Sequence, residues 1–203
     1  SDVYKRQNKW EPSSPFHICI ANQVLHHIVE LEHVFDQVKS GLAPGGLFLT
    51  SDMVGRNGHR RWPEAVRALQ PFWEELPEQY RYHHVLKRVE SRFVNYDVGR
   101  HSFEGIRAQD ILPLLVERFH FDLFFAFANI VYVFIERSFG PNFDPEREWD
   151  RDFVDRVHAR DEAGMLSGEL KPTQMIAALC NFKTETKLVN PLLTPRFCVR
   201  PPN

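Results

Sequence analysis

The sequence predicts an α/β protein with a doubly wound, mainly parallel sheet, and three consecutive segments carry this prediction. The apolar run FHICIA at 16–21 is too short for a helix and follows a turn cluster, so it is interpreted as a buried strand. Residues 29–41 carry apolar side chains at helical spacing and end at a glycine. A second apolar run follows at 47–51. Strand, helix and strand at this spacing form a βαβ unit with adjacent parallel strands.

Periodicity and turn residues predict the elements that follow. Residues 56–100 show no strand-like alternation before 91–94, so we expect mostly helix there, inserted after the second strand. The further elements expected in chain order are a helix at 106–119, a strand at 121–125, a charged amphipathic helix at 144–166 that stops at Gly168, a last strand at 175–182, and an unassigned proline-containing tail from 183.

The composition is that of a globular protein and excludes several classes of partner. A chain of 203 residues, 43% apolar and 26% charged, can bury a substantial core. The net charge of -2 gives no electrostatic footprint for nucleic acid. The most apolar run, 121–135, is shorter than the roughly 20 residues of a membrane span. Cys19, Cys180 and Cys198 lack a CxxC pair, so we expect no disulfide framework and a cytoplasmic location.

The first seven residues, SDVYKRQ, look like translated sequencing adapter and are left out of the fold prediction. No start methionine precedes them. We therefore expect the C-terminal part of one longer domain at 8–182, truncated at its N-terminus, with helical insertions at 56–100 and 127–168 and a tail at 183–203. Because long insertions usually supply specificity, we expect residues 56–100 and 139–166 to select the substrate; the alternative is that they form an oligomer interface.

Two coupled motifs stand at 16–28, FHICIANQVLHHI, and at 42–49, LAPGGLFL. Together they resemble the middle of class I S-adenosylmethionine-dependent methyltransferases. That family has a strand that ends in a vLhHi turn at the first motif, and LkpGG leads into the next strand at the second. A looser similarity, at 103–107, 137–144 and 171–175, is to a methyltransferase subgroup often found beside glycosyltransferases.

The resemblance implies a Rossmann-like sheet in which the strands near 121 and 175 are antiparallel partners and the second lies beside 47–51. It implies S-adenosylmethionine as cofactor and a small-molecule methyl acceptor, with a saccharide-related acceptor as one option. The family's GxGxG loop and the acidic residue after the next strand are absent from this sequence. We therefore expect the 203-residue chain alone to be inactive and its longer parent to methylate. The alternative is a non-catalytic α/β interaction module on the same scaffold.

The cofactor residues follow from the resemblance alone. Ala21, Asn22 and Gln23 would contact the methionine end of the cofactor, and His26 or His27 would border the methyl-transfer cleft. A general base is needed when the acceptor is a protonated hydroxyl or amine.

We expect the catalytic candidates to be His26, His27 and Asp52, with His101 as a further possible base. The competing interpretations are a packed or capping histidine and an ordinary loop aspartate.

Arginines after the second strand are candidates for substrate binding. Arg56 and Arg60 could hold an anionic group, because guanidinium binds phosphate and carboxylate bidentately; the alternative is a solvated basic turn. His101, Glu104 and Arg107 complete the substrate candidates. No metal site is expected, since the HHxxxxxH pattern of His26, His27 and His33 lacks the spacing of zinc enzymes. The oligomeric state is not predicted.

Overall fold

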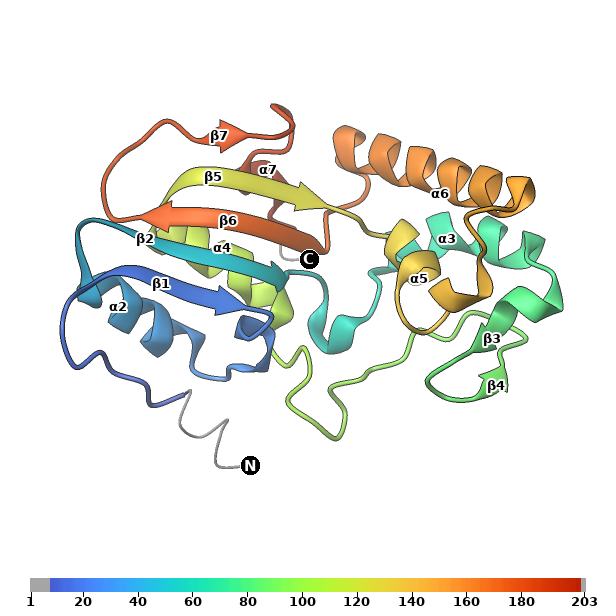
Figure 1. Cartoon of the computed structure of the whole chain (residues 1–203), viewed down its shortest axis with the longest axis horizontal. Coiled ribbons are helices and arrows are strands. Elements are labelled where there is room, and N and C mark those ends of the chain that lie inside the picture. The colour runs from blue at the N-terminus through green and yellow to red at the C-terminus, as the bar shows by residue number, and fades with distance from the viewer. Residues whose placement is uncertain (1–7, 202–203) are drawn as a thin grey trace. The chain divides into compact units, whose positions relative to one another are not determined.

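The computed structural model describes residues 8–201, so the adapter-like segment predicted at 1–7 lies outside the described residues. The chain divides into two compact units (Figure 1). Unit 1 consists of Ser1–Arg60, Asp97–Phe127 and Pro172–Asn203, and unit 2 consists of Arg61–Tyr96 and Ala128–Lys171. The two segments of unit 2 overlap the insertions that the sequence placed at 56–100 and 127–168.

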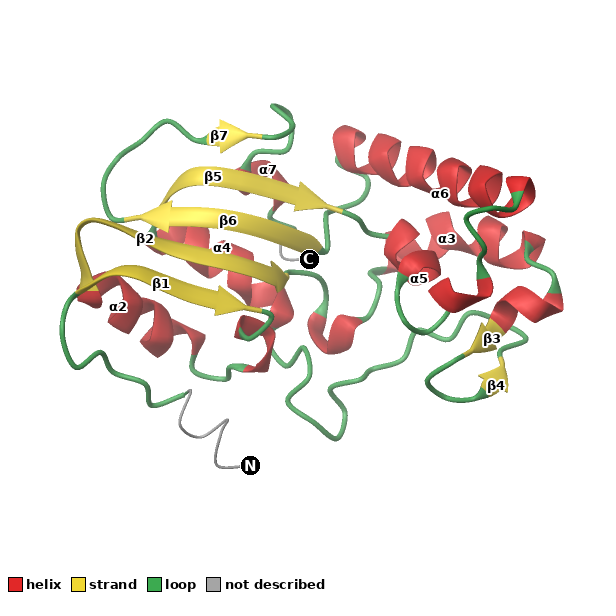
Figure 2. Cartoon of the chain, in the orientation of Figure 1, coloured by secondary structure: helices red, strands yellow, loops and turns green. Residues whose placement is uncertain are grey.

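Unit 1 is built on a mixed five-stranded sheet with the strand order β1-β2-β6-β5-β7 (Figure 2). β1 (Phe16–Asn22) and β2 (Leu42–Met53) are adjacent and parallel, and α2 (Leu31–Gly41) connects them. The βαβ unit predicted from the sequence is therefore confirmed. The buried residues of α2 recur at helical spacing, as an amphipathic helix over a sheet requires.

The antiparallel strands also lie where the sequence analysis expected them. β6 (Gln174–Cys180) pairs antiparallel with β2 on one side and with β5 (His120–Phe127) on the other. A buried cluster of Phe35, Phe48 and Phe119 joins α2, the sheet and the end of α4 (Ala108–Arg118). The predicted α/β class, the helix at 106–119 and the strand near 121 are thus confirmed.

Within unit 1, both long helices lie on the same face of the sheet. α2 and α4 lie behind the strands in the view of Figure 1. On the opposite face Ile18 is 61% exposed and Ile20 is 69% exposed, although both stand on a predicted buried strand. The expectation of a doubly wound sheet, which has helices on both faces, is therefore not met by unit 1 alone.

The tail departs from the prediction, which left it without structure after a last strand at 175–182. β7 (Lys187–Leu188) pairs in parallel with β5, and α7 (Pro195–Cys198) follows. Leu193 and Cys198 are buried, so the tail completes the core of unit 1. β6 is therefore not the last strand. A strand of two residues is too short to produce a periodic pattern in the sequence.

Unit 2 contains two amphipathic helices and a small hairpin. α3 (Pro63–Glu75) begins with proline, and α6 (Glu148–Ser167) ends at Gly168, whose φ of 79° is left-handed as the predicted stop requires. The predicted helix at 144–166 is confirmed. Residues 56–100 were expected to be mostly helical, and this holds for α3 but not for the rest. After α3 a short 3-10 helix (Glu78–Arg81) and turns surround the hairpin of β3 (Tyr82–His83) and β4 (Arg88–Val89).

The remaining elements are short. α5 (Val131–Ile135) belongs to unit 2, together with a 3-10 helix at Gly140–Asn142, and unit 1 has 3-10 helices at Leu25–His27 and Asn57–His59. No helix between residues 8 and 201 has the length and apolar character needed to cross a membrane.

Candidate functional site

The carboxyl ends of β1 and β2 lie at one edge of the sheet in unit 1. Asn22 stands opposite Ser51, so the two strands stay paired to the end of β1. The next residue, Gln23, has a φ of 51° and donates its backbone N–H to the Ser51 carbonyl at 2.8 Å. The chain therefore turns sharply at this edge, where open α/β sheets commonly bind ligands. Ala21, Asn22 and Gln23 lie there, as the resemblance implies.

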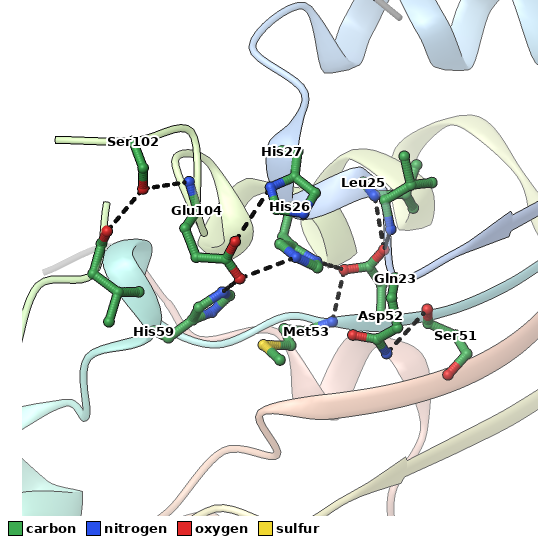
Figure 3. Close-up of polar contacts among 12 residues, drawn as sticks. Gln23, Leu25, His26, His27, Ser51, Asp52, Met53, His59, Ser102 and Glu104 are labelled. Atoms are coloured by element: carbon green, nitrogen blue, oxygen red, sulfur yellow. Dashed lines mark hydrogen bonds and ion pairs between the residues drawn. The ribbon is translucent and has the colours of Figure 1, made fainter. Parts of the chain in front are cut away.

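Asp52 is fully buried and accepts hydrogen bonds at both carboxylate oxygens (Figure 3). Oδ2 accepts from the backbone N–H groups of Val24 at 2.9 Å and Leu25 at 2.8 Å. Oδ1 accepts from Met53 N at 2.8 Å and contacts Nδ1 of His26 at 2.6 Å. Such bonding compensates a buried carboxyl group for the loss of water, so Asp52 anchors the turn after β1.

Asp52 also fixes the orientation of the His26 ring. Both carboxylate oxygens already accept backbone N–H groups, so the proton of the contact between His26 and Asp52 belongs to Nδ1 of the imidazole. His26 is itself buried, and its other nitrogen, Nε2, lies 3.5 Å from Oε1 of Glu104. In the neutral ring this Nε2 carries a lone pair that is directed away from Asp52.

Glu104 is surrounded by three imidazoles (Figure 3). Besides His26, its Oε1 lies 3.1 Å from Nε2 of His59, and its Oε2 lies 3.6 Å from Nδ1 of His27. The rings of His26 and His59 meet edge to face with centroids 5.1 Å apart. The cluster of His26, His27, His59 and Glu104 is thus a compact set of proton-accepting and metal-binding groups at the edge of the sheet.

Backbone hydrogen bonds join the three segments that supply this cluster. Ile106 N donates to the His26 carbonyl at 3.0 Å, and Gly58 N donates to the Gly105 carbonyl at 2.9 Å. Gly105 has a φ of +64°, and a Cβ there would lie 2.9 Å from Cε1 of His59. Only glycine therefore allows the loop before α4 to approach His59 this closely.

His59 itself has a left-handed backbone, with a φ of 55°. Non-glycine residues seldom adopt this conformation, and where they do the surrounding structure holds them there. The bonds between Gly58 and Gly105, and from Val98 N to the Gly58 carbonyl at 3.1 Å, provide that support. The position of the His59 ring is thus determined by the fold of the loop.

Of the predicted substrate residues, Glu104 lies in the cluster and the others lie outside it. Arg60 donates from Nε to the Asn57 carbonyl at 3.1 Å and lies 3.6 Å from Asp97. Arg56 stands in the same loop after β2, and His101 is exposed in the loop that leads to α4. The predicted substrate roles of these residues stay predictions.

The Arg107 side chain is bound by two carboxylates, Glu32 on α2 and Asp110 on α4. Its guanidinium forms a bidentate pair with Glu32 at 2.6 and 2.7 Å, and Nε donates to Asp110 at 2.8 Å. The bonds from Arg107 lower the pKa of Glu32 to about 2, and the pKa of Arg107 is raised. Through these bonds the Arg107 side chain joins the start of α2 to α4. A substrate that bound to Arg107 would have to displace both carboxylates.

His59 was not among the predicted site residues. The histidines considered from the sequence as metal ligands also differ from those that the structure brings together. They were His26, His27 and His33, but His33 lies on α2. One ligand atom each from His26, His59 and Glu104 instead lies within 4.8 Å of the others. Among the described residues this is a group that could hold a metal ion. Separations of 33 and 45 residues along the chain leave no local pattern for sequence reasoning to find.

The comparisons with known proteins add no assignment. No protein-family model matches the sequence, and no curated protein matches it.

Proposed function

We propose that this chain supplies the methyl-transfer side of an S-adenosylmethionine-dependent methyltransferase that acts on a small molecule. The observation that carries the proposal is the pair of Asp52 and His26 at the carboxyl edge of two adjacent parallel strands. The sheet order β1-β2-β6-β5, with β6 antiparallel to both neighbours, supports it, because this is the arrangement that the sequence resemblance implies.

The proposed roles follow from position at that edge. Ala21, Asn22 and Gln23 would contact the methionine end of the cofactor, as the resemblance implies. The acceptor would approach from the side of His26 and Glu104, where a lone pair and a carboxylate are available to an acceptor proton. Asp52 contacts neither partner directly and acts as a positioning residue for His26.

The reaction asks little else of the protein. Bound S-adenosylmethionine would supply its activated methyl group to an oxygen or nitrogen of the acceptor and would leave as S-adenosylhomocysteine. Ala21, Asn22 and Gln23 would hold its methionine end, and the acceptor proton would pass to the cluster of His26 and Glu104. Alignment of the acceptor with the sulfonium supplies much of the acceleration, so a fixed edge is better suited to this chemistry than a mobile loop.

The test measures S-adenosylhomocysteine released by the complete product of the gene that encodes these residues, with a panel of hydroxyl and amine acceptors that includes saccharides. We expect Asp52→Asn to lower kcat about 10- to 100-fold, because the His26 ring loses its fixed orientation, and to leave KM for S-adenosylmethionine nearly unchanged. Asp36→Asn is the matched control, since Asp36 is an exposed carboxylate on α2 that pairs with Arg118.

The alternative, a non-catalytic interaction module, predicts a different result. The wild-type protein would then bind no S-adenosylmethionine, and Asp52→Asn would change stability alone. Equal kcat values for Asp52→Asn and Asp36→Asn in an active enzyme would contradict the proposed role of the pair.

A further inference from the structure

We propose that His26, His59 and Glu104 form a binding site for a divalent transition-metal ion. One ligand atom from each of these residues lies within 4.8 Å of the others. Figure 3 shows the two imidazoles and the carboxylate turned toward one another from three separate segments of unit 1. Two histidines and one carboxylate are a common ligand set for zinc and for non-haem iron.

Two of the three separations between ligand atoms are close to those around a coordinated ion, and all three atoms lie within 4.8 Å of one another. Zinc bonds to imidazole nitrogen and carboxylate oxygen are about 2.0–2.2 Å long, which places neighbouring ligand atoms about 3.3 Å apart around a tetrahedron. Oε1 of Glu104 lies 3.1 Å from Nε2 of His59 and 3.5 Å from Nε2 of His26. Both separations are near that value before any ion enters.

Asp52 provides the outer support that metal-binding histidines usually have. It accepts the Nδ1 proton of His26 at 2.6 Å, which directs the Nε2 lone pair toward Glu104. A carboxylate behind a histidine in this way fixes its tautomer and raises its basicity as a ligand. A cation placed between Nε2 of His26 and Oε1 of Glu104 would bond to both atoms.

The surrounding structure holds the ligands before an ion binds. His26 is buried, and the backbone bond from Gly58 to Gly105 joins the loops that carry His59 and Glu104. Magnesium and calcium prefer shells made of oxygen, so the two imidazoles favour zinc or iron, for which cobalt is a substitute. Three protein ligands leave further coordination positions open for water or for an acceptor hydroxyl.

The binding claim is independent of the proposed methyl transfer, and only the role of the ion rests on it. With an ion bound, His26 and Glu104 would be ligands and would not take the acceptor proton themselves. The ion would instead lower the pKa of a coordinated acceptor hydroxyl, whose proton would leave to water. Only the pKa of the acceptor hydroxyl would change, and the oxidation state of the ion would stay the same.

The test titrates the tag-free, metal-stripped 203-residue chain with Co²⁺ and follows the visible absorption of the ion and the heat of binding. We expect one ion per chain, displaced by Zn²⁺. His59→Ala and Glu104→Gln should each weaken binding at least 100-fold, because each removes one of three ligands. Both side chains are partly exposed, so these variants test the site without emptying the core. Circular dichroism checks that each variant is folded.

His33→Ala is the matched control, because His33 belongs to the same chain segment but lies on α2 and outside the cluster. Binding of Co²⁺ by His59→Ala and Glu104→Gln with wild-type affinity would overturn the inference, as would a wild-type chain that binds no ion. The two proposals fail separately. Methyl transfer by a metal-free enzyme would overturn only the role of the ion. If the protein binds the metal ion but not S-adenosylmethionine, only the methyltransferase proposal is overturned.

Discussion

Each unit contains a buried aspartate that accepts backbone N–H groups. The two aspartates differ in their further contacts. Asp161 of unit 2 accepts from Asn129 N at 2.7 Å, Ile130 N at 3.0 Å and Val131 N at 3.4 Å, where α5 begins. Asp52 of unit 1 accepts three backbone N–H groups in the same way and also orients His26.

The charge around the two aspartates explains their different uses. Burial raises the pKa of Asp161, while the three N–H groups and the nearby Arg61 oppose that rise. These partners are backbone groups and a buried side chain of the same unit. The extra partner of Asp52 is an imidazole whose second nitrogen faces Glu104 and the edge of the sheet. The same buried chemistry thus stabilises a helix start in one unit and orients the imidazole of His26 in the other.

The largest expected effect is the loss of the structural aspartate. Asp161→Ala removes the acceptor of three N–H groups and the negative charge beside the buried Arg61, which should cost about 3–5 kcal/mol of unfolding free energy. Urea denaturation followed by tryptophan fluorescence, to which the buried Trp73 of unit 2 contributes, measures this loss. Cobalt binding by the folded variant should equal that of the wild type. Weakened binding would contradict the distinction between a structural Asp161 and an Asp52 that supports the site.

The matching change in unit 1 should act on the site. Asp52→Asn keeps the size of the side chain but removes the charge behind His26, so cobalt affinity should fall about 10- to 100-fold, or about 1.4–2.7 kcal/mol. Competition with a chelator of known affinity measures the change. If affinity is unchanged while the protein is destabilised, Asp52 is a structural residue like Asp161.

Two glycines separate backbone strain from contact with His59. Gly105→Ala and Gly45→Ala both place a side chain at positive φ, which should cost on the order of 1–2 kcal/mol each. A Cβ at Gly45 has no neighbour within 4 Å, whereas one at Gly105 would lie 2.9 Å from the ring of His59. Only Gly105→Ala should therefore weaken cobalt binding, and the same titration decides it.

The smallest effect concerns pH and the pair of Glu32 and Arg107. Arg107 lowers the pKa of Glu32 from 4.5 to about 2, so the unfolded chain binds more protons than the folded chain between those values. The contribution of the pair is complete above pH 4.5 and is lost as the pH falls toward 2. Since the Glu32 side chain is 44% exposed, solvent screening limits that contribution to about 1 kcal/mol or less.

Glu32→Gln removes the titrating group, so its unfolding free energy should depend less on pH between 4.5 and 2 than that of the wild type. Urea denaturation at several pH values measures both slopes. Equal slopes would show that the pair contributes nothing to stability.

The fold was predictable where side chains repeat over a full element. The βαβ unit, the antiparallel pair of β5 and β6, and α6 with its stop at Gly168 follow from periodicity, glycine chemistry and the family resemblance. The turns at 76–100 and the two-residue β7 could not be predicted in this way, because tertiary contacts determine such short segments.

The candidate site was predictable in its parts rather than in its assembly. The sequence singled out His26, Asp52 and Glu104 through the strand end and the family resemblance. It gave no sign that His59 would join them, because a left-handed backbone at His59 and close approach at Gly105 bring distant loops together. The exposed face of β1 was also unexpected, since an apolar strand is the same in sequence whether one face or both are covered.

The most direct test of the central claim is the position of the transferred methyl group. With [methyl-¹³C]S-adenosylmethionine bound to the complete gene product, carbon-filtered nuclear Overhauser spectra report the protons within a few ångströms of that methyl. We predict contacts to the ring protons of His26 or His27 and to the residues at 21–23. Contacts confined to residues away from the carboxyl edge of β1 and β2, or no bound cofactor, would contradict the account.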